Sequence, residues 1–301
     1  MCAAAALCYP AGVPGQTADY NQPFRPQVHF SPLRNWTNDP NGLVYFRGEY
    51  HLFFQYNPEG DEWGHMSWGH AVSRDLLHWR QLPVAIPEQN GIMIFTGSVV
   101  IDQDNTSGFC AHGEPCLVAI YTGNSQTPEG GRQTQNLAYS LDDGRTWTKY
   151  AKNPVLDLRL ADFRDPSVSW DAETHRWHMA VSLPQEHRIS FYSSPNLKEW
   201  THLSDFGRAG NTAGAWECPD LVRVPFADGR GSMWALKIGI NPGALQGGRA
   251  SNTSWAISTE ENLRHRRSPG LTDGPTTARM TTARSASTGC PRASSRSCWA
   301  G

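Results

Sequence analysis

The sequence predicts an all-β protein in which one sheet unit repeats along the chain, and two repeated patterns carry this prediction. Three short motifs place a carboxylate one or two residues before a proline and ahead of a β-rich run, at residues 38–42, 164–166 and 217–220. Proline fixes its own φ and restricts the preceding residue, so the backbone around each acid is pre-set. Three other segments run from Ser through a tight polar turn to Trp, at residues 73–79, 140–147 and 194–200.

Hairpin signals predict four such units. Pairs of β runs surround polar turns in residues 43–56, 168–181 and 221–240, and the runs 98–101 and 117–121 flank a longer loop. No long segment has helical periodicity. The units are expected to start near four residues, Asp39, Thr96, Asp165 and Glu217.

The spacing of the Trp residues is close to that of a propeller blade, a repeat of about 40–50 residues. Radially arranged four-stranded sheets form a β-propeller, and its innermost strands line a central channel. We expect the first strand of a unit to follow its carboxylate, which gathers Asp39, Asp165 and Glu217 at one mouth of the channel. Carboxylates gathered in this way suit acid–base and nucleophilic sugar chemistry.

The composition agrees with a turn-rich β protein. The 301 residues include 12 Trp, 11 Phe, 9 Tyr, 28 Gly and 21 Pro, and 18 % are charged. The net charge of −2 gives no reason to expect nucleic acid or an anionic membrane as partner. No apolar run is long enough to span a bilayer.

The two ends of the chain differ from the centre. We predict a flexible N-terminal segment at 1–22, the β-propeller domain at 23–262 and an Arg/Ser/Thr-rich tail at 263–301. The tail has Arg throughout but one acid, Asp273, and too few apolar residues to offset chain entropy, so we expect disorder. Its abrupt change of composition favours out-of-frame translation, and a basic arm for nucleic acid is the alternative.

The cysteines and the N-terminus leave the cellular compartment open. Seven cysteines is an odd number, and Cys110 and Cys116 are close enough to close a small loop. Residues 2–8 are apolar and are either the end of a secretory signal or a frayed terminus. Residues 35–37, 105–107 and 252–254 match the glycosylation acceptor pattern, which matters only in a secreted eukaryotic protein.

The motifs together resemble glycoside hydrolase family 32, the invertases, inulinases and levanases. Residues 35–42 look like the family signature, and 164–166 and 217–219 match its other two catalytic motifs in the same order. Residues 51–58 and 63–70 are also similar to family segments. The resemblance runs from about residue 20 to about residue 257, and Thr37 stands where the family usually has Met.

The resemblance implies a fold and an activity. The family has a five-bladed β-propeller followed by a C-terminal β-sandwich, and this sequence retains about four blades, so the fifth blade and the sandwich are expected to be missing. The implied activity is hydrolysis of terminal β-D-fructofuranosyl bonds in inulin, levan or sucrose by retaining double displacement. No cofactor or metal is expected, because carboxylates and water suffice.

The resemblance also implies residue roles. Asp39 is the expected nucleophile, Glu217 the general acid and base, and Asp165 a ligand for fructosyl hydroxyls. The carboxyl groups of Asp39 and Glu217 are expected about 5–5.5 Å apart. Further contacts to the substrate are expected from residues with amide, aromatic, hydroxyl or guanidinium groups: Asn38, Gln55, Trp63, Phe95, Thr96 and Arg164.

Each of these residues has a plainer interpretation. Asp39 lies in good turn chemistry, Glu217 is alternatively a solvated loop acid, and Arg164 with Asp165 is alternatively a structural ion pair. Trp63 is alternatively a core residue. Two histidines, His65 and His70, are expected to pack or form hydrogen bonds rather than bind metal, because their spacing indicates no coordination geometry.

Two other functions are carried as alternatives. One is an inactive fragment or weak sugar binder, because a missing blade exposes apolar faces and removes a wall of the pocket. The other is an inverting arabinan-type hydrolase, with carboxylates about 6.5–9.5 Å apart. An extracellular or periplasmic location is favoured over a cytoplasmic one, and the preferred fructan and the oligomeric state are left open.

Overall fold

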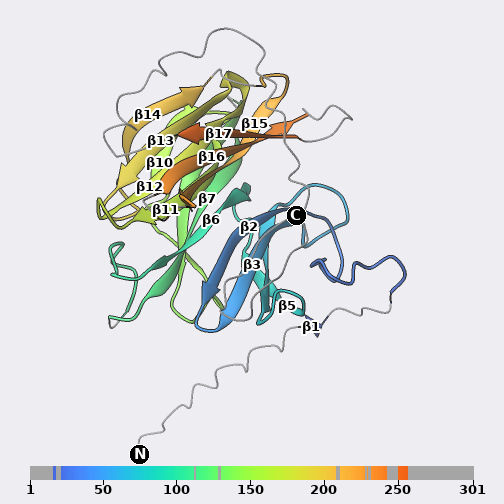
Figure 1. The fold of residues 1–301 in the computed structure, drawn as a ribbon. Helices are drawn as coiled ribbons and strands as arrows, with labels where there is room; N and C mark the ends of the chain where they lie inside the picture. Colours follow the sequence, from blue (N-terminus) through green and yellow to red (C-terminus); the bar gives the residue numbers. More distant parts are fainter. Residues whose placement is uncertain are drawn as a thin grey trace, which may run out of the picture. The chain divides into compact units, whose positions relative to one another are not determined.

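The protein is almost entirely β-structure (Figure 1). The computed structural model describes residues 16–17, 22–111, 113–127, 130–207, 211–227, 229, 232–242 and 250–256. These residues form four antiparallel sheets and a 3-10 helix, η1 (Pro184–Glu186), and none of their helices could cross a membrane. The predicted tail at 263–301 and most of the predicted segment 1–22 lie outside the described residues.

The first sheet has the strand order β1-β5-β4-β3-β2. The hairpin between its last two strands turns at Arg47 and Gly48, both with positive φ, as the sequence predicted for the polar turn in residues 43–56. Its strands are β1 (Gln16–Thr17), β2 (Thr37–Phe46), β3 (Glu49–Tyr56), β4 (Ser67–Ser73) and β5 (Trp79–Ile86).

The second sheet has the order β10-β8-β7-β6, and a short strand, β9, also pairs with β8. A disulfide joins Cys110, in the loop that follows β6, to Cys116, the first residue of β7. The small loop predicted from the cysteine spacing is therefore confirmed. Its strands are β6 (Ile92–Asp102), β7 (Cys116–Thr127), β8 (Gly130–Ser140), β9 (Thr148–Lys149) and β10 (Leu156–Leu160).

The third sheet has the order β11-β12-β13-β14, and the fourth has the order β15-β16-β17. The third sheet is the simple meander that the hairpin signals predicted. Its strands are β11 (Arg164–Asp171), β12 (Arg176–Leu183), β13 (Arg188–Ser194) and β14 (Thr201–Gly207). The strands of the fourth sheet are β15 (Ala215–Pro225), β16 (Ser232–Asn241) and β17 (Ala250–Ala256).

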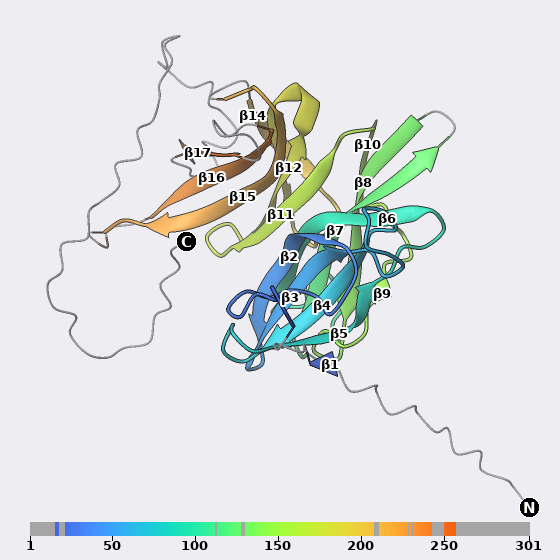
Figure 2. The ribbon, with the colours of Figure 1, turned by 90° about the vertical axis from the view of Figure 1, so that its right-hand side faces the viewer.

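One edge strand of each sheet lies against an edge strand of the next. β2 contacts β6, β6 contacts β11, and β11 contacts β15 (Figure 2). Each of these strands is an edge of its own sheet, and the next strands in the chain follow outward from it, except that the two-residue β1 pairs with β5 at the outer edge and the short β9 pairs with β8. This is the arrangement of propeller blades, and the four predicted unit starts fall on these four strands.

The hydrophobic core lies between consecutive sheets. One cluster joins the first and second sheets, including Phe53, Trp68 and Leu117. A larger cluster joins the second and third sheets, and a third cluster packs Trp216 of β15 against the third sheet. Because each sheet has an apolar face toward its neighbour, these cores fix the inner strands relative to one another.

The predicted Ser-to-Trp turns share one hydrogen-bond pattern. In each turn the Ser Oγ accepts a backbone N–H of the turn, at Ser73, Ser140 and Ser194. The indole N–H at the end of each turn donates to the carbonyl oxygen three residues earlier, over 2.9–3.0 Å. Trp79, Trp147 and Trp200 are therefore structural repeats of the blades.

Candidate active site

The three candidate acids lie on irregular positions of the innermost strands. The pairing register shifts between Thr37 and Pro40 in β2, between Arg164 and Ser167 in β11, and between Glu217 and Asp220 in β15. A bulge of this kind interrupts the ladder and redirects a side chain. The acids were expected just before their strands; this was wrong in detail, because the ladder resumes on both sides of each bulge.

The second sheet has the same irregularity without an acid. The register of β6 shifts between Ile94 and Gly97, so Phe95 and Thr96 occupy the place that the acids hold in the other sheets. The Thr96 Oγ1 donates a hydrogen bond to the Asp39 Oδ2 over 3.2 Å. Two predicted site residues from different sheets are therefore in direct contact.

Two residues of the site have left-handed backbone conformations. Asp165 has φ 63° and Cys218, next to Glu217, has φ 47°. Such conformations are uncommon for residues other than glycine and cluster at functional sites, where surrounding contacts maintain them. At Asp165 one such contact is the backbone N–H of Cys218, which donates to Oδ2 over 2.9 Å.

Arg164 connects two of the three acids. Its Nη2 donates to Glu217 Oε1 over 3.0 Å, and its Nε lies 3.9 Å from Asp165 Oδ2. A third carboxylate, on Asp162, accepts from Nη1 over 2.6 Å. Burial lowers the pKa of Arg164, but the charges of Asp165 and Glu217 outweigh it and raise the pKa above its usual value. Arg164 is thus a fixed cation that orients both acids.

Asp165 is the most buried of the three acids, with 6 % of its side chain exposed. Burial raises its pKa to about 6, and the Arg164 charge and the Cys218 N–H oppose that rise. The negative charges of Asp39 and Glu217 raise it further, so the three carboxylates form one electrostatic cluster. Burial and the same three carboxylates also raise the pKa of the Cys218 thiol, so this cysteine stays protonated.

The remaining predicted contact residues differ in their hydrogen-bond partners and in their exposure to solvent. Asn38 Oδ1 accepts from the indole N–H of Trp36 over 3.0 Å. Gln55 is buried, and its Nε2 donates to the Ile94 carbonyl over 3.1 Å, at the entry to the β6 bulge. Trp63 is 55 % exposed, which does not fit the alternative that it is a core residue.

Trp63 and Phe95 form an aromatic pair. Their ring centroids are 6.1 Å apart in an edge-to-face arrangement. Phe95 directly precedes Thr96, which contacts Asp39, so this pair lies next to the acidic cluster. An exposed aromatic face beside hydrogen-bonding groups suits the apolar face of a sugar ring.

The two histidines of the Trp/Gly-rich segment make packing and hydrogen-bond contacts. His65 Nδ1 lies 2.9 Å from Glu88 Oε2. His70 is buried, stacks on Phe53 and lies 3.1 Å from His51. Burial lowers the pKa of His70 well below its usual value. Among the described residues, no group of three or more His, Cys, Asp or Glu side chains is placed to hold a metal ion.

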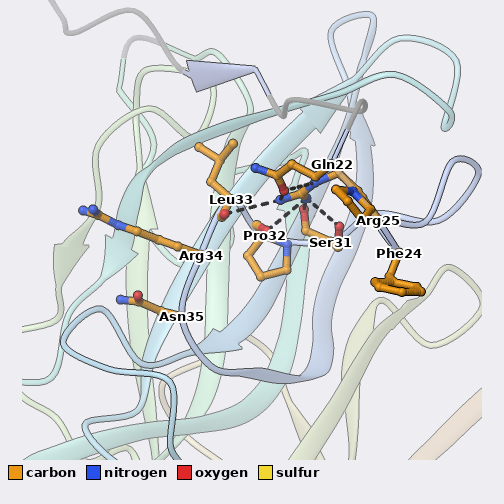
Figure 3. Close-up of a pocket in the computed structure, with 9 residues that line it drawn as sticks. Gln22, Phe24, Arg25, Ser31, Pro32, Leu33, Arg34 and Asn35 are labelled. Atoms are coloured by element: carbon orange, nitrogen blue, oxygen red, sulfur yellow. Dashed lines mark hydrogen bonds between the residues drawn. The ribbon is translucent and has the colours of Figure 1, made fainter.

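A separate hollow of about 320 Å³ precedes the β2 motif in the chain and contains none of the three acids (Figure 3). Arg25 is one of its lining residues and donates to Gln22, to the Ser31 side chain and to the carbonyls of Pro32 and Leu33. The guanidinium is satisfied by this loop itself. We therefore assign Arg25 to holding the approach to β2 rather than to ligand binding.

The sequence did not indicate the polar residues of the second sheet that hold the backbone around Arg164. Thr122 and Gln135 are fully buried and contact the backbone of the β11 motif. The available signal was the polar run 133–136, because polar side chains that become buried need hydrogen-bond partners. Asp162, the third partner of Arg164, was also missed.

Residues 29–268 match the Glycosyl hydrolases family 32 N-terminal domain. The chain belongs to glycosyl hydrolase family 32. It is 44 % identical over 276 residues to an extracellular exo-inulinase of Aspergillus ficuum, a match that covers 84 % of this chain and 51 % of that protein. It is 50 % identical over 234 residues to the levanase of Bacillus subtilis, covering 76 % of this chain and 33 % of the levanase.

The fold agrees with solved structures of the family. The crystal structure of exo-inulinase from Aspergillus awamori superposes with a TM-score of 0.74 at 43 % identity and covers 80 % of this chain. That match covers 51 % of the exo-inulinase, so the family 32 chain spans about half the length of such relatives. The predicted all-β propeller fold and the predicted family are confirmed.

Proposed function

We propose that this family 32 chain carries the site of a retaining β-fructofuranosidase acting on terminal fructosyl units of inulin, levan or sucrose. The observation that carries the proposal is the cluster itself, in which Arg164 joins Glu217 to Asp165 while Asp39 lies within the same electrostatic environment. The relatives named exo-inulinase and levanase supply the substrate class. The extracellular location named for the exo-inulinase supports secretion.

The proposed chemistry has two steps. In the first, a carboxylate oxygen of Asp39 bonds to the anomeric carbon as the glycosidic bond breaks, and Glu217 gives its proton to the leaving oxygen. In the second, Glu217 takes a proton from water, which attacks the same carbon and releases Asp39. Asp165 accepts hydrogen bonds from fructosyl hydroxyls, and these bonds strengthen in the oxocarbenium-like transition state.

The groups around the acids fit these roles. Thr96 donates to Asp39 Oδ2, and this hydrogen bond orients the carboxylate that acts as the nucleophile. Arg164 fixes the position of Glu217 through a hydrogen bond to Oε1. Asn38, Gln55, Trp63 and Phe95 complete the proposed sugar contacts, and the proposal needs no metal or cofactor.

The test is release of fructose from inulin by the purified chain, with products resolved by size. We expect fructose as the product, and we expect Asp39→Asn and Glu217→Gln each to lower kcat by at least ~10³-fold. Asp104→Asn, a matched change at an exposed acid, is the control. Near-full activity in either site variant contradicts the assignment.

Two alternatives give different results in the same experiment. Reaction in the presence of methanol distinguishes the stereochemistry, because a retaining enzyme gives the methyl β-fructofuranoside and an inverting enzyme gives none. A folded sample that releases no fructose but binds it indicates a non-catalytic sugar binder. Fructose release without the methyl glycoside replaces the proposal with an inverting hydrolase, and binding without release replaces it with a sugar binder.

A further inference from the structure

Two residues of the second sheet form hydrogen bonds to the backbone at the start of β11, on either side of Arg164. Thr122 on β7 and Gln135 on β8 are directly paired across the ladder between these strands. Both side chains are fully buried, at 0 % exposure. A buried polar side chain destabilises the fold unless its hydrogen bonds are satisfied. The hydrogen-bond partners of Thr122 and Gln135 therefore indicate the role of these two residues.

The hydrogen bonds form a closed clamp around Arg164. The backbone N–H of Asp165 donates to Thr122 Oγ1 over 3.0 Å, and that hydroxyl donates to Gln135 Oε1 over 2.9 Å. The Gln135 Nε2 then donates to the carbonyl of Phe163 over 2.7 Å. The peptide groups on both sides of Arg164 are thus fixed by one pair of side chains.

A second buried residue of β8 extends the clamp. Gln133 Oε1 accepts the backbone N–H of Phe163 over 2.9 Å, and its Nε2 donates to Asn124 Oδ1 over 3.2 Å. Both polar groups of the Phe163 backbone are therefore bound to side chains of the second sheet. The residue directly before Arg164 is therefore held through both of its backbone polar groups.

Comparable hydrogen bonds cross to the next sheet at other bulges. Gln55 of β3 donates to the carbonyl of Ile94, just before the β6 bulge. Ser182 of β12 donates to the carbonyl of Trp216, directly before Glu217. In each case a buried side chain from one sheet holds the backbone that enters the bulge of the following sheet. The clamp on Arg164 is the most complete of these contacts.

We propose that Thr122 and Gln135 are positioning residues that hold Arg164 and Asp165 in their working conformation. The left-handed backbone of Asp165 is unfavourable by itself, and the clamp maintains it. Because Arg164 donates to Glu217, the clamp also sets the orientation of the proposed acid and base. The expected effect of the clamp on catalysis rests on the proposed function, whereas its effect on the backbone rests on the hydrogen-bond geometry alone.

The test compares three variants of the whole chain. Thr122→Val removes the hydroxyl with little change of side-chain shape, whereas Thr122→Ser keeps the hydroxyl and removes only the methyl group. Thr106→Val is the matched control, because Thr106 also links two buried contacts, Asp102 and the Trp177 indole, outside the site. Circular dichroism and the melting temperature verify that all three remain folded.

The first readout is exchange of the Asp165 amide hydrogen, measured with residue resolution. We expect faster exchange in Thr122→Val and exchange like that of the parent in Thr122→Ser and Thr106→Val. A Thr122→Val variant that exchanges this amide as slowly as the parent overturns the clamp. This readout does not depend on activity.

The second readout is the steady-state kinetics of fructose release. We expect Thr122→Val to lower kcat roughly 10–100-fold with a smaller change in KM, since small displacements of catalytic groups carry penalties of this size. We expect Thr122→Ser to restore kcat and Thr106→Val to leave it unchanged. An active parent whose kcat survives Thr122→Val overturns the positioning role, whereas an inactive parent contradicts the proposed function and leaves the amide result to decide the clamp.

Discussion

At the scale of single residues, Asp165 is where burial and charge oppose each other. Burial raises its pKa from 3.8 to about 6, against the attraction of Arg164. In the unfolded chain the carboxyl titrates near its ordinary value, so between about pH 4 and pH 6 the folded protein holds a proton that the unfolded chain has released. The contribution of this group to stability therefore falls as pH rises through that window.

Asp165→Asn tests this sign. The amide stays neutral at every pH, so we expect its melting temperature relative to that of the parent to rise between about pH 4 and about pH 7.5. The corresponding change in the free energy of unfolding is about 2–3 kcal/mol, at 1.36 kcal/mol per pKa unit. Urea unfolding at the two pH values measures it. A constant difference, or one that shrinks at neutral pH, contradicts the buried-carboxylate account.

The gathering of three acids could be predicted from the sequence, but the residues that hold them in place could not. Asp39, Asp165 and Glu217 each stand one or two residues before a proline in a repeated motif, which is a local signal. Thr122 and Gln135 act across a sheet boundary, on a backbone that lies 43 and 28 residues further along the chain. Their effect depends on which strand pairs with which and in what register, and a single sequence does not specify that.

At the scale of elements, the Ser-to-Trp turns were predictable because the hydrogen bonds that shape them are local. In each turn the Ser hydroxyl accepts at least one backbone N–H, and an Asp or Asn two residues later accepts others. The bulges were not predictable, because a register shift depends on the partner strand. This difference explains why the strands were expected to begin after the acids instead of around them.

The turns allow a test of additivity. Ser73→Ala, Ser140→Ala and Ser194→Ala each leave a turn N–H without its acceptor, and we expect each to lower the free energy of unfolding by about 1 kcal/mol. Because the three turns belong to different sheets, the triple variant should lose about the sum. Urea denaturation measures the losses, and Ser204→Ala on β14 is the control. A triple variant far less stable than the sum indicates that the turns interact.

At the scale of the whole molecule, the sheets depend on shared cores. Among the described residues, the first and fourth sheets each share an apolar core with one neighbouring sheet, whereas the second and third share cores on both sides. The inner strands of the two outer sheets correspondingly carry exposed apolar side chains. Leu43 on β2 is 48 % exposed and Val222 on β15 is 42 % exposed.

These exposed side chains predict self-association of the 301-residue chain. Apolar side chains on strand surfaces favour contact with another molecule, because association removes them from water. We expect light scattering to show a mass that rises with protein concentration, and we expect the double variant Leu43→Glu, Val222→Glu to reduce that rise. Leu77→Glu is the matched control, since Leu77 is 50 % exposed but lies in a turn. A parent chain that stays monodisperse at high concentration shows that the strand faces do not drive association, and an equal effect of Leu77→Glu shows that added charge alone is responsible.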